Sequence, residues 1–167
     1  MAKITLDGTP IKTIGELPAI GSHISDFKLV ATDLSTKTLA NFNGSRLILN
    51  IFPSVNTGVC SASIRQFNQE ANRLENTKIL CISRDLPFVQ DQFCAAEGLK
   101  NIIMLSDFKN GDFGKDYGLL ITSGAFDALL SRSIIVTDES GKVVYTEQVP
   151  EIAQEPNYKS ALEALNI

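Results

Sequence analysis

Several classes of protein are excluded by what the 167-residue sequence lacks. No window approaches the roughly 18 consecutive apolar residues of a membrane-spanning helix, and residues 1–8 lack the apolar stretch of a secretory signal. The formal net charge is -4, and no basic stripe with interleaved aromatic residues suggests a nucleic-acid surface. We therefore expect a cytoplasmic protein whose partners include neither membrane nor nucleic acid.

The sequence also lacks the residues that several kinds of catalytic site require. A cysteine protease needs a base beside its nucleophile, and the only histidine is His23 in the N-terminal loop. Thiol–disulfide exchange usually uses a C-x-x-C motif, which is absent. The segment from Cys60 to Arg65 is one residue too short for a cysteine phosphatase loop and contains no glycine. No His/Cys cluster has zinc-ligand spacing, so we expect neither a metal nor an organic cofactor.

Cysteine itself is scarce, with one residue at each of positions 60, 81 and 94. A small secreted scaffold has a denser and even set, whereas a chain of this length buries enough core to fold without disulfides. Two of the three cysteines could form a reversible pair and leave one as a buried thiol. The count therefore points to chemistry more than to structural cross-links.

The hydrophobic pattern predicts an α/β fold in three layers, formed by a single domain over residues 1–167. The turn dipeptide Asp7-Gly8 predicts an N-terminal β-hairpin. We predict further strands at 27–31, 47–52, 78–83, 101–106, 133–137 and 142–146. Of these, 47–52 is a nearly continuous apolar run, interrupted by Asn50 alone, and is predicted to be a central strand.

Three helices are predicted between and after these strands. The spacing of Ile64, Phe67, Ala71 and Leu74 places them on one helix face. A second helix is expected to begin near Asp85, a possible cap, and to end around 98. The third is expected to run from about 156 to 165.

Cys60 is predicted to lie just past the end of a strand, on the first turn of the next helix. Sites form at this edge of parallel sheets, and unpaired N–H groups of a helix start favour a thiolate. Thr57, three residues earlier, could direct its hydroxyl back to the sulfur. On this reasoning alone Cys60 could equally be a small buried hydrophobe.

Three other residues each have two interpretations. Arg132 precedes an apolar strand and could be an ordinary strand-end charge that reaches water. Cys94 lies mid-helix beside Phe93, as a core thiol would. Cys81 lies within the apolar strand 78–83, and we interpret it as an inert core thiol.

The segment P-S-V-N-T-G-V-C, residues 53–60, resembles the peroxiredoxin pattern P-x-x-x-T-x-x-C. With L-I-L-N-I-F-P, T-K-I-L-C-I-S-R-D-L-P-F, Q-F-C-A-A-E-G-L, S-R-S-I-I-V-T-D and the E-P-N-Y tail, the whole chain resembles the bacterial thiol peroxidase subfamily, the atypical two-cysteine peroxiredoxins. The resemblance implies a thioredoxin-like three-layer sandwich.

The resemblance also implies roles for individual residues. Cys60 would be the peroxidatic cysteine, Thr57 would contact its sulfur and the peroxide, and Pro53 would shield the pocket from water. Arg132 would stabilise the thiolate and polarise the peroxide. Cys94 would be the resolving cysteine, which forms an intrachain disulfide with Cys60. The implied enzyme is a thioredoxin-dependent peroxiredoxin that reduces hydrogen peroxide and organic hydroperoxides and acts as a homodimer.

Two hypotheses accompany this assignment. Because a disulfide requires Cα atoms within about 4.4–6.8 Å, the Cys60 turn and part of the Cys94 helix are expected to unwind during turnover. The aromatic-rich segment 108–126 is a candidate dimer interface. A peroxide sensor or redox relay, which passes the disulfide to a partner protein, is the alternative function.

Overall fold

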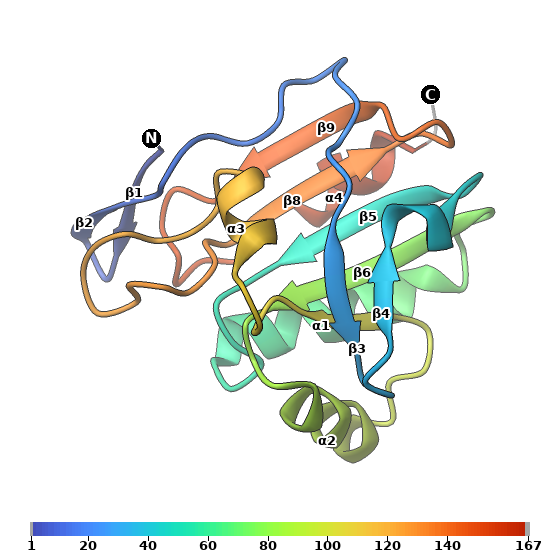
Figure 1. Ribbon diagram of the computed structural model, residues 1–167, viewed down its shortest axis with the longest axis horizontal. Coiled ribbons are helices and arrows are strands. Elements are labelled where there is room, and N and C mark those ends of the chain that lie inside the picture. Colours follow the sequence, from blue (N-terminus) through green and yellow to red (C-terminus); the bar gives the residue numbers. More distant parts are fainter. Residues whose placement is uncertain (1, 166–167) are drawn as a thin grey trace.

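The computed structural model describes residues 2–165 (Figure 1). Its strands are β1 (Lys3–Leu6), β2 (Thr9–Lys12), β3 (Lys28–Ala31), β4 (Thr36–Thr38), β5 (Arg46–Ile51), β6 (Thr77–Ser83), β7 (Ile103–Ser106), β8 (Ser133–Thr137) and β9 (Val143–Gln148). Its helices are the 3-10 helix η1 (Leu39–Phe42) and the α-helices α1 (Gly58–Ala71), α2 (Pro87–Glu97), α3 (Asp112–Asp116) and α4 (Tyr158–Glu163).

Seven strands form one mixed sheet in the order β4-β3-β7-β6-β5-β8-β9. β5 pairs in parallel with β6 and antiparallel with β8, so it lies inside the sheet as its nearly continuous apolar run predicted. β1 and β2 form a separate antiparallel hairpin, also as predicted. The hairpin buries Ile4 and Ile11 against Ile121 and Ile152.

Alternate side chains of β5 enter two hydrophobic clusters, one on each face of the sheet. Leu47, Leu49 and Ile51 pack in the cluster that contains Phe113 of α3. Ile48 packs in the other, which includes Ile64 and Phe67 of α1 and Ala161 of α4. Val89 and Phe93 of α2 pack against this second cluster. Helices therefore cover both faces, which confirms the predicted three layers (Figure 1).

Some predicted boundaries are wrong. Leu74 lies beyond α1, whose C-cap is Asn72. α2 begins with Leu86 as its N-cap and Pro87 in its first turn, so Asp85 does not cap it. Asp85 instead accepts hydrogen bonds from the segment that precedes Cys60. α4 is shorter than expected because Asn157 caps it, its side chain accepting a hydrogen bond from the Ser160 N–H.

The segment 108–126 contains the five-residue helix α3, which is too short for its periodicity to be recognised in the sequence. Phe113, Tyr117 and Leu119 are all buried in the chain's own core. They are therefore not available as apolar contacts for a second subunit. A dimer interface over 108–126 would therefore have to use the other side chains of this segment.

Candidate active site

Cys60 lies on the first turn of α1, which begins at Gly58 after the N-cap residue Thr57. Its side chain is fully buried and belongs to the cluster that contains Phe52, Val55 and Ile64. The loop before α1 follows directly from β5, so the sulfur lies at the carboxyl end of an interior strand. This is the placement that the sequence predicted.

Arg132 reaches Cys60 through the pairing of strands. β8 runs antiparallel to β5, and the register places Ser133 opposite Ile51, the last residue of β5. Arg132 therefore lies beside the point where the chain leaves β5 toward α1. The sheet thus brings together two side chains that are 72 positions apart in the sequence.

The Arg132 guanidinium is held in a fixed orientation. Its Nε donates to the carbonyl oxygen of Ile152 at 2.7 Å, and its Nη2 donates to the Cys60 Sγ at 3.2 Å. Only 1% of the residue is exposed, so the alternative of a strand-end charge reaching water is wrong. The buried guanidinium is therefore in direct contact with the Cys60 sulfur. The sequence offers no signal for Ile152, because its contribution is a backbone carbonyl.

The third guanidinium nitrogen, Nη1 of Arg132, is buried and has no hydrogen-bond partner among the described residues. An unpaired buried donor is costly, and a charged one more so. Such a group in a native structure often marks a ligand position. Nη1 is therefore available to an oxygen atom that approaches the sulfur.

A cavity of about 170 Å³ adjoins Arg132. Its other lining residues are Leu6, Asp7, Thr57, Gly58, Val59, Phe126, Ile152 and Ala153. Much of this lining is apolar, with contributions from the N-terminal hairpin and from the start of α1. The cavity can accept a small molecule with an apolar body at the edge of the guanidinium.

Thr57 and Pro53 both lie in the segment between β5 and Cys60, but the Thr57 hydroxyl does not point at the sulfur. It donates to the Ser54 carbonyl oxygen at 3.3 Å rather than to the Cys60 sulfur. Thr57 remains on the cavity wall, so a rotation of its side chain would bring the hydroxyl to a bound ligand. Pro53 is buried, in the loop between β5 and α1.

Cys94 lies on α2, a different helix from Cys60, and both cysteines are free thiols. The Cys94 side chain is half-buried and packs against the cluster that contains Cys60. Desolvation, with a smaller contribution from the carboxylate of Asp91, raises the pKa of Cys94 to about 11. The thiol is therefore protonated at neutral pH in this conformation.

Cys81 is the third thiol, and it lies in β6 with its side chain fully buried. Burial raises its pKa to about 12, while the Asn50 amide, which donates to the sulfur at 3.7 Å, acts in the opposite direction. A protonated thiol without solvent access is a poor nucleophile. This environment agrees with the interpretation of Cys81 as a core residue.

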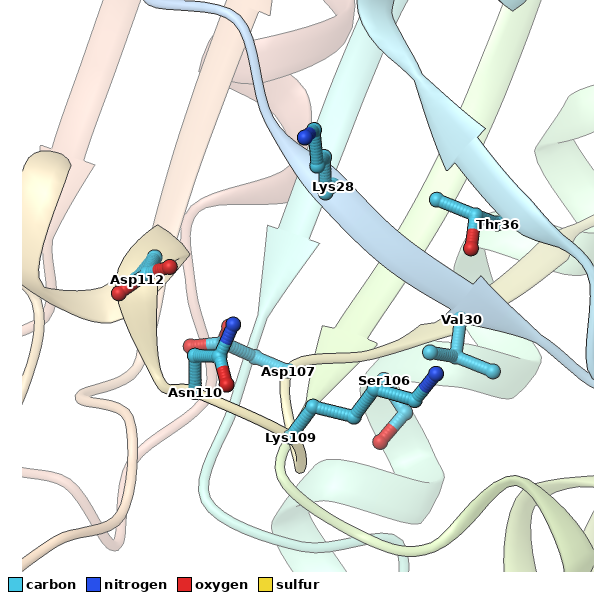
Figure 2. A pocket seen from close by; sticks show the side chains of 8 residues that line it. All are labelled: Lys28, Val30, Thr36, Ser106, Asp107, Lys109, Asn110 and Asp112. Carbon is cyan, nitrogen blue, oxygen red and sulfur yellow. The ribbon is translucent and has the colours of Figure 1, made fainter.

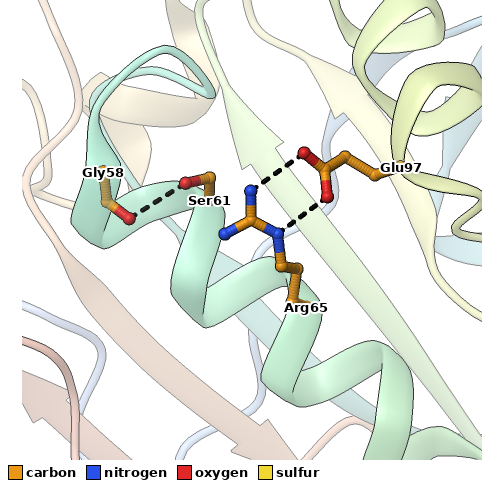
Figure 3. A network of polar contacts seen from close by, with 4 residues as sticks. All are labelled: Gly58, Ser61, Arg65 and Glu97. Carbon is orange, nitrogen blue, oxygen red and sulfur yellow. Dashed lines mark hydrogen bonds and ion pairs between the residues drawn. The ribbon is translucent and has the colours of Figure 1, made fainter.

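Two alternative chemistries are incompatible with the geometry. His23 forms a bridge with Lys142, at the opposite end of the β8–β9 hairpin from Arg132, so it cannot serve Cys60 as a base. Arg65 is bound to both carboxylate oxygens of Glu97, and therefore does not face a phosphate cradle around Cys60 (Figure 3).

A second cavity, of about 190 Å³, contains none of the predicted site residues (Figure 2). It is lined from β3, β4 and the segment after β7, by Lys28, Val30, Thr36, Ser106, Asp107, Lys109, Asn110 and Asp112. The carboxylate of Asp107 accepts hydrogen bonds there from the backbone N–H groups of Phe113 and Gly114. The cavity contains no nucleophile of the kind that Cys60 provides.

Residues 2–165 contain neither a cluster of potential metal ligands nor a membrane-spanning helix. No three His, Cys, Asp or Glu side chains come together as potential metal ligands in this part of the chain. None of its helices has the length and hydrophobicity to cross a membrane.

Comparison with known proteins shows the family to which this chain belongs. Residues 19–162 match the Redoxin family model. The chain is 49% identical over 166 residues to a thiol peroxidase of Corynebacterium glutamicum, covering 99% of this chain and 100% of the relative. It is 50% identical over 165 residues to a thiol peroxidase of Mycobacterium tuberculosis, covering 99% of both chains.

Solved structures agree with this result. A peroxiredoxin-like protein from Aquifex aeolicus superimposes with a TM-score of 0.93 at 31% identity, covering 99% of this chain and 96% of that one. A thiol peroxidase from Chromobacterium violaceum, at 23% identity, shares the fold with a TM-score of 0.91 over 98% of this chain and 95% of its own. This chain therefore belongs to the redoxin family, as a peroxiredoxin-type enzyme of the thiol peroxidase subfamily.

Proposed function

We propose that the enzyme reduces hydroperoxides through Cys60, with Cys94 as the resolving cysteine. The observation that carries the proposal is the Arg132 guanidinium, whose Nη2 donates to the Cys60 sulfur while its Nη1 has no partner among the described residues. One planar group can thus hold the thiolate and bind a peroxide oxygen at the same time. Preorganised donors of this kind stabilise charge that develops in a transition state.

In the first step the Cys60 thiolate attacks the terminal oxygen of the hydroperoxide. The S–O bond forms as the O–O bond breaks, so the sulfur becomes a sulfenic acid and the peroxide leaves as an alkoxide or hydroxide. The leaving oxygen takes up a proton to give an alcohol or water. Arg132 Nη1, which has no partner among the described residues, would stabilise the negative charge on that oxygen, and Thr57 on the cavity wall would bind the peroxide.

In the second step the Cys94 sulfur attacks the Cys60 sulfenic acid, and water leaves as the disulfide forms. The two sulfurs lie on different helices, so the first turn of α1 and part of α2 must unwind before they can bond. A dithiol reductant then returns both cysteines to thiols and is itself oxidised to a disulfide. We propose thioredoxin as that reductant.

The cavity supports a substrate range that includes organic hydroperoxides as well as hydrogen peroxide. Leu6, Val59 and Phe126 provide an apolar wall beside Arg132. Such a wall would bind an alkyl chain by removing its surface from water. Pro53 in the loop before α1 would help exclude water from the sulfur.

Three further properties belong to the proposal. Residues 1–167 act as one domain, since Leu6 and Asp7 of the hairpin turn line the same cavity as Thr57 and Arg132. The protein works in the cytoplasm, where free thiols persist. It forms a homodimer, which sedimentation at micromolar concentration would show as a species of twice the chain mass.

The test is peroxide consumption by the wild type and by the Cys60→Ser and Cys94→Ser variants, with thioredoxin, its reductase and NADPH, and with product masses recorded. We expect Cys60→Ser to be inactive. Cys94→Ser should form one sulfenic acid and then fail to recycle. Turnover by Cys60→Ser would overturn the assignment. A wild-type protein that reacts once and stops would instead support the sensor or relay function.

A further inference from the structure

The carboxylate of Asp85 connects the N-terminal end of the Cys94 helix to the loop before Cys60. Its Oδ1 accepts a hydrogen bond from the Ser54 hydroxyl at 2.7 Å. Its Oδ2 accepts one from the Val55 backbone N–H at 2.9 Å and one from the Ser83 hydroxyl at 2.6 Å. A charged acceptor makes each of these bonds stronger than a neutral one would.

The two loop residues that Asp85 holds are in direct connection with the active site. Val55 is 2% exposed and belongs to the same hydrophobic cluster as Cys60. The Ser54 carbonyl oxygen accepts the hydrogen bond of the Thr57 hydroxyl, and its side-chain oxygen accepts one from the Asn56 N–H at 3.2 Å. The position of the Ser54–Val55 segment therefore determines where the first turn of α1 begins.

Asp85 is itself fixed to the ends of two strands. Its backbone N–H donates to the Ser83 hydroxyl oxygen at 3.3 Å, and its carbonyl oxygen accepts a hydrogen bond from the Ser106 hydroxyl. The buried Gln90 of α2 also donates to the Ser83 oxygen, at 3.2 Å. β6 and β7 thus provide a rigid base from which the carboxylate reaches the loop.

We propose that Asp85 is a positioning residue for the peroxidatic step, acting through Ser54 and Val55 on the placement of Cys60. This inference rests on the proposed function. Because displacement of a reacting group by about 1 Å can cost on the order of 100-fold in rate, loss of the carboxylate should slow the attack on peroxide. Loss of the carboxylate should have a much smaller effect on a reaction of the Cys60 thiolate that requires no aligned partner, such as alkylation.

The experiment compares two second-order rate constants at Cys60 in the full-length chain carrying Cys94→Ser. One is the rate of sulfenic acid formation with hydrogen peroxide, and the other is the rate of alkylation by iodoacetamide; peptide masses locate both products. The variant is Asp85→Asn, whose amide keeps the size of the side chain but has a single acceptor oxygen. The matched control is Asp138→Asn, because Asp138 accepts three hydrogen bonds from Ser140 and Lys142 in a turn far from Cys60.

We expect Asp85→Asn to lower the peroxide rate by about 10- to 100-fold and the alkylation rate by less than about threefold. Asp138→Asn should leave both rates unchanged. A peroxide rate within about twofold of the parent, or an equal fall in both rates, would overturn the inference. If Asp85→Asn does not fold, Ser54→Ala tests the same inference, because it removes the hydrogen bond from the Ser54 hydroxyl to Asp85. We expect Ser54→Ala to lower the peroxide rate by about fivefold and to leave the alkylation rate unchanged.

The result for the Cys94→Ser parent distinguishes failure of this inference from failure of the proposed function on which it rests. If the parent forms no sulfenic acid at Cys60, the proposed function fails and the inference fails with it. If the parent reacts and Asp85→Asn reacts equally fast, only the positioning role fails.

Discussion

Arg65 on α1 and Glu97 on α2 form a bidentate ion pair between the two helices that carry Cys60 and Cys94 (Figure 3). The Nε–Oε2 distance is 2.8 Å and the Nη2–Oε1 distance is 2.9 Å. Glu97 is the last residue of α2, three positions after Cys94. The pair therefore joins the turn of α2 that follows Cys94 to the helix that carries Cys60.

Breaking this ion pair should accelerate disulfide formation, because that step requires α2 to open. Solvent-exposed pairs contribute only modestly to stability, so we expect Glu97→Gln to raise the rate of the Cys60–Cys94 reaction by about 1.4- to 5-fold. Quenched-flow mass spectrometry after one equivalent of peroxide measures this rate. In the wild type, 1 M salt should have a similar effect by screening the pair. The control is Glu163→Gln, which removes an exposed pair on α4. A slower reaction in Glu97→Gln would contradict the prediction.

Replacing Arg132 by lysine should impair the peroxide reaction even though the charge is retained. A lysine ammonium is a point charge and cannot reproduce the fork that contacts Ile152 and Cys60 while leaving a third nitrogen free. We expect the rate of Cys60 oxidation to fall by about 100- to 1000-fold, the usual effect of losing one preorganised donor. Competition against a peroxidase of known rate provides the measurement. Near-normal oxidation would mean that charge alone suffices.

Disulfide formation should accelerate with pH, because Cys94 reacts as its thiolate and the pKa of the thiol is raised to about 11. While α2 remains folded around Cys94, the thiolate fraction, and with it the rate, should rise about tenfold per pH unit between pH 7 and 9. If unwinding exposes the thiol before it reacts, the rise should level off near the ordinary thiol pKa of about 8.5. Asp91→Asn removes a nearby negative charge and lowers this pKa, so resolution at pH 8 should be about two- to fivefold faster. Asp91→Glu retains the charge and should resemble the wild type. Equal rates in the three proteins would exclude this electrostatic effect.

Glu151 should hold the N-terminal hairpin in place only while its carboxylate is ionised. It accepts hydrogen bonds from the Thr5 hydroxyl and from the Asp7, Gly8 and Ala153 N–H groups, which lower its pKa from about 4.5 to about 2. A depressed pKa gives a stabilising contribution that is complete above pH 4.5 and is lost as the pH falls toward 2.

We therefore expect hydrogen exchange of the hairpin amides, corrected for the intrinsic rate, to accelerate over this acid range. Glu151→Gln should show the faster exchange already at pH 7. Glu139→Gln, in the turn between β8 and β9, is the control. Unchanged exchange in Glu151→Gln would show that burial of Ile4 and Ile11 is sufficient to hold the hairpin.

Features that depend on neighbours along the chain were predictable from the sequence. The apolar run of β5 indicated an interior strand, and the order strand, loop, helix placed Cys60 at a helix start. Asp7-Gly8 correctly indicated the hairpin turn. Short elements such as β4 and α3 were missed, since three to five residues carry too little periodicity to be distinguished from a loop.

The hydrogen bonds of Asp85 could not be predicted from its neighbours in the sequence. Its position before Leu86-Pro87 made it a plausible helix cap, yet its carboxylate accepts hydrogen bonds from Ser54 and Val55, about 30 residues away. Side-chain capping competes with every other donor within reach, and those donors are set by the tertiary fold. The Thr57 hydroxyl was mispredicted for a local reason, because it donates to the Ser54 carbonyl oxygen three residues earlier.

The sequence by itself determined which candidate groups the chain carries: a cysteine at a helix start, a threonine three residues before it, and an arginine beside an apolar strand. Only the tertiary structure decided that Arg132 is buried against Cys60, with one nitrogen that has no partner among residues 2–165. It also decided that Cys94 lies on a separate helix whose last residue is paired with Arg65. The physical reason is that chemical type is a property of each residue, whereas orientation and desolvation arise when distant strands pair and exclude water.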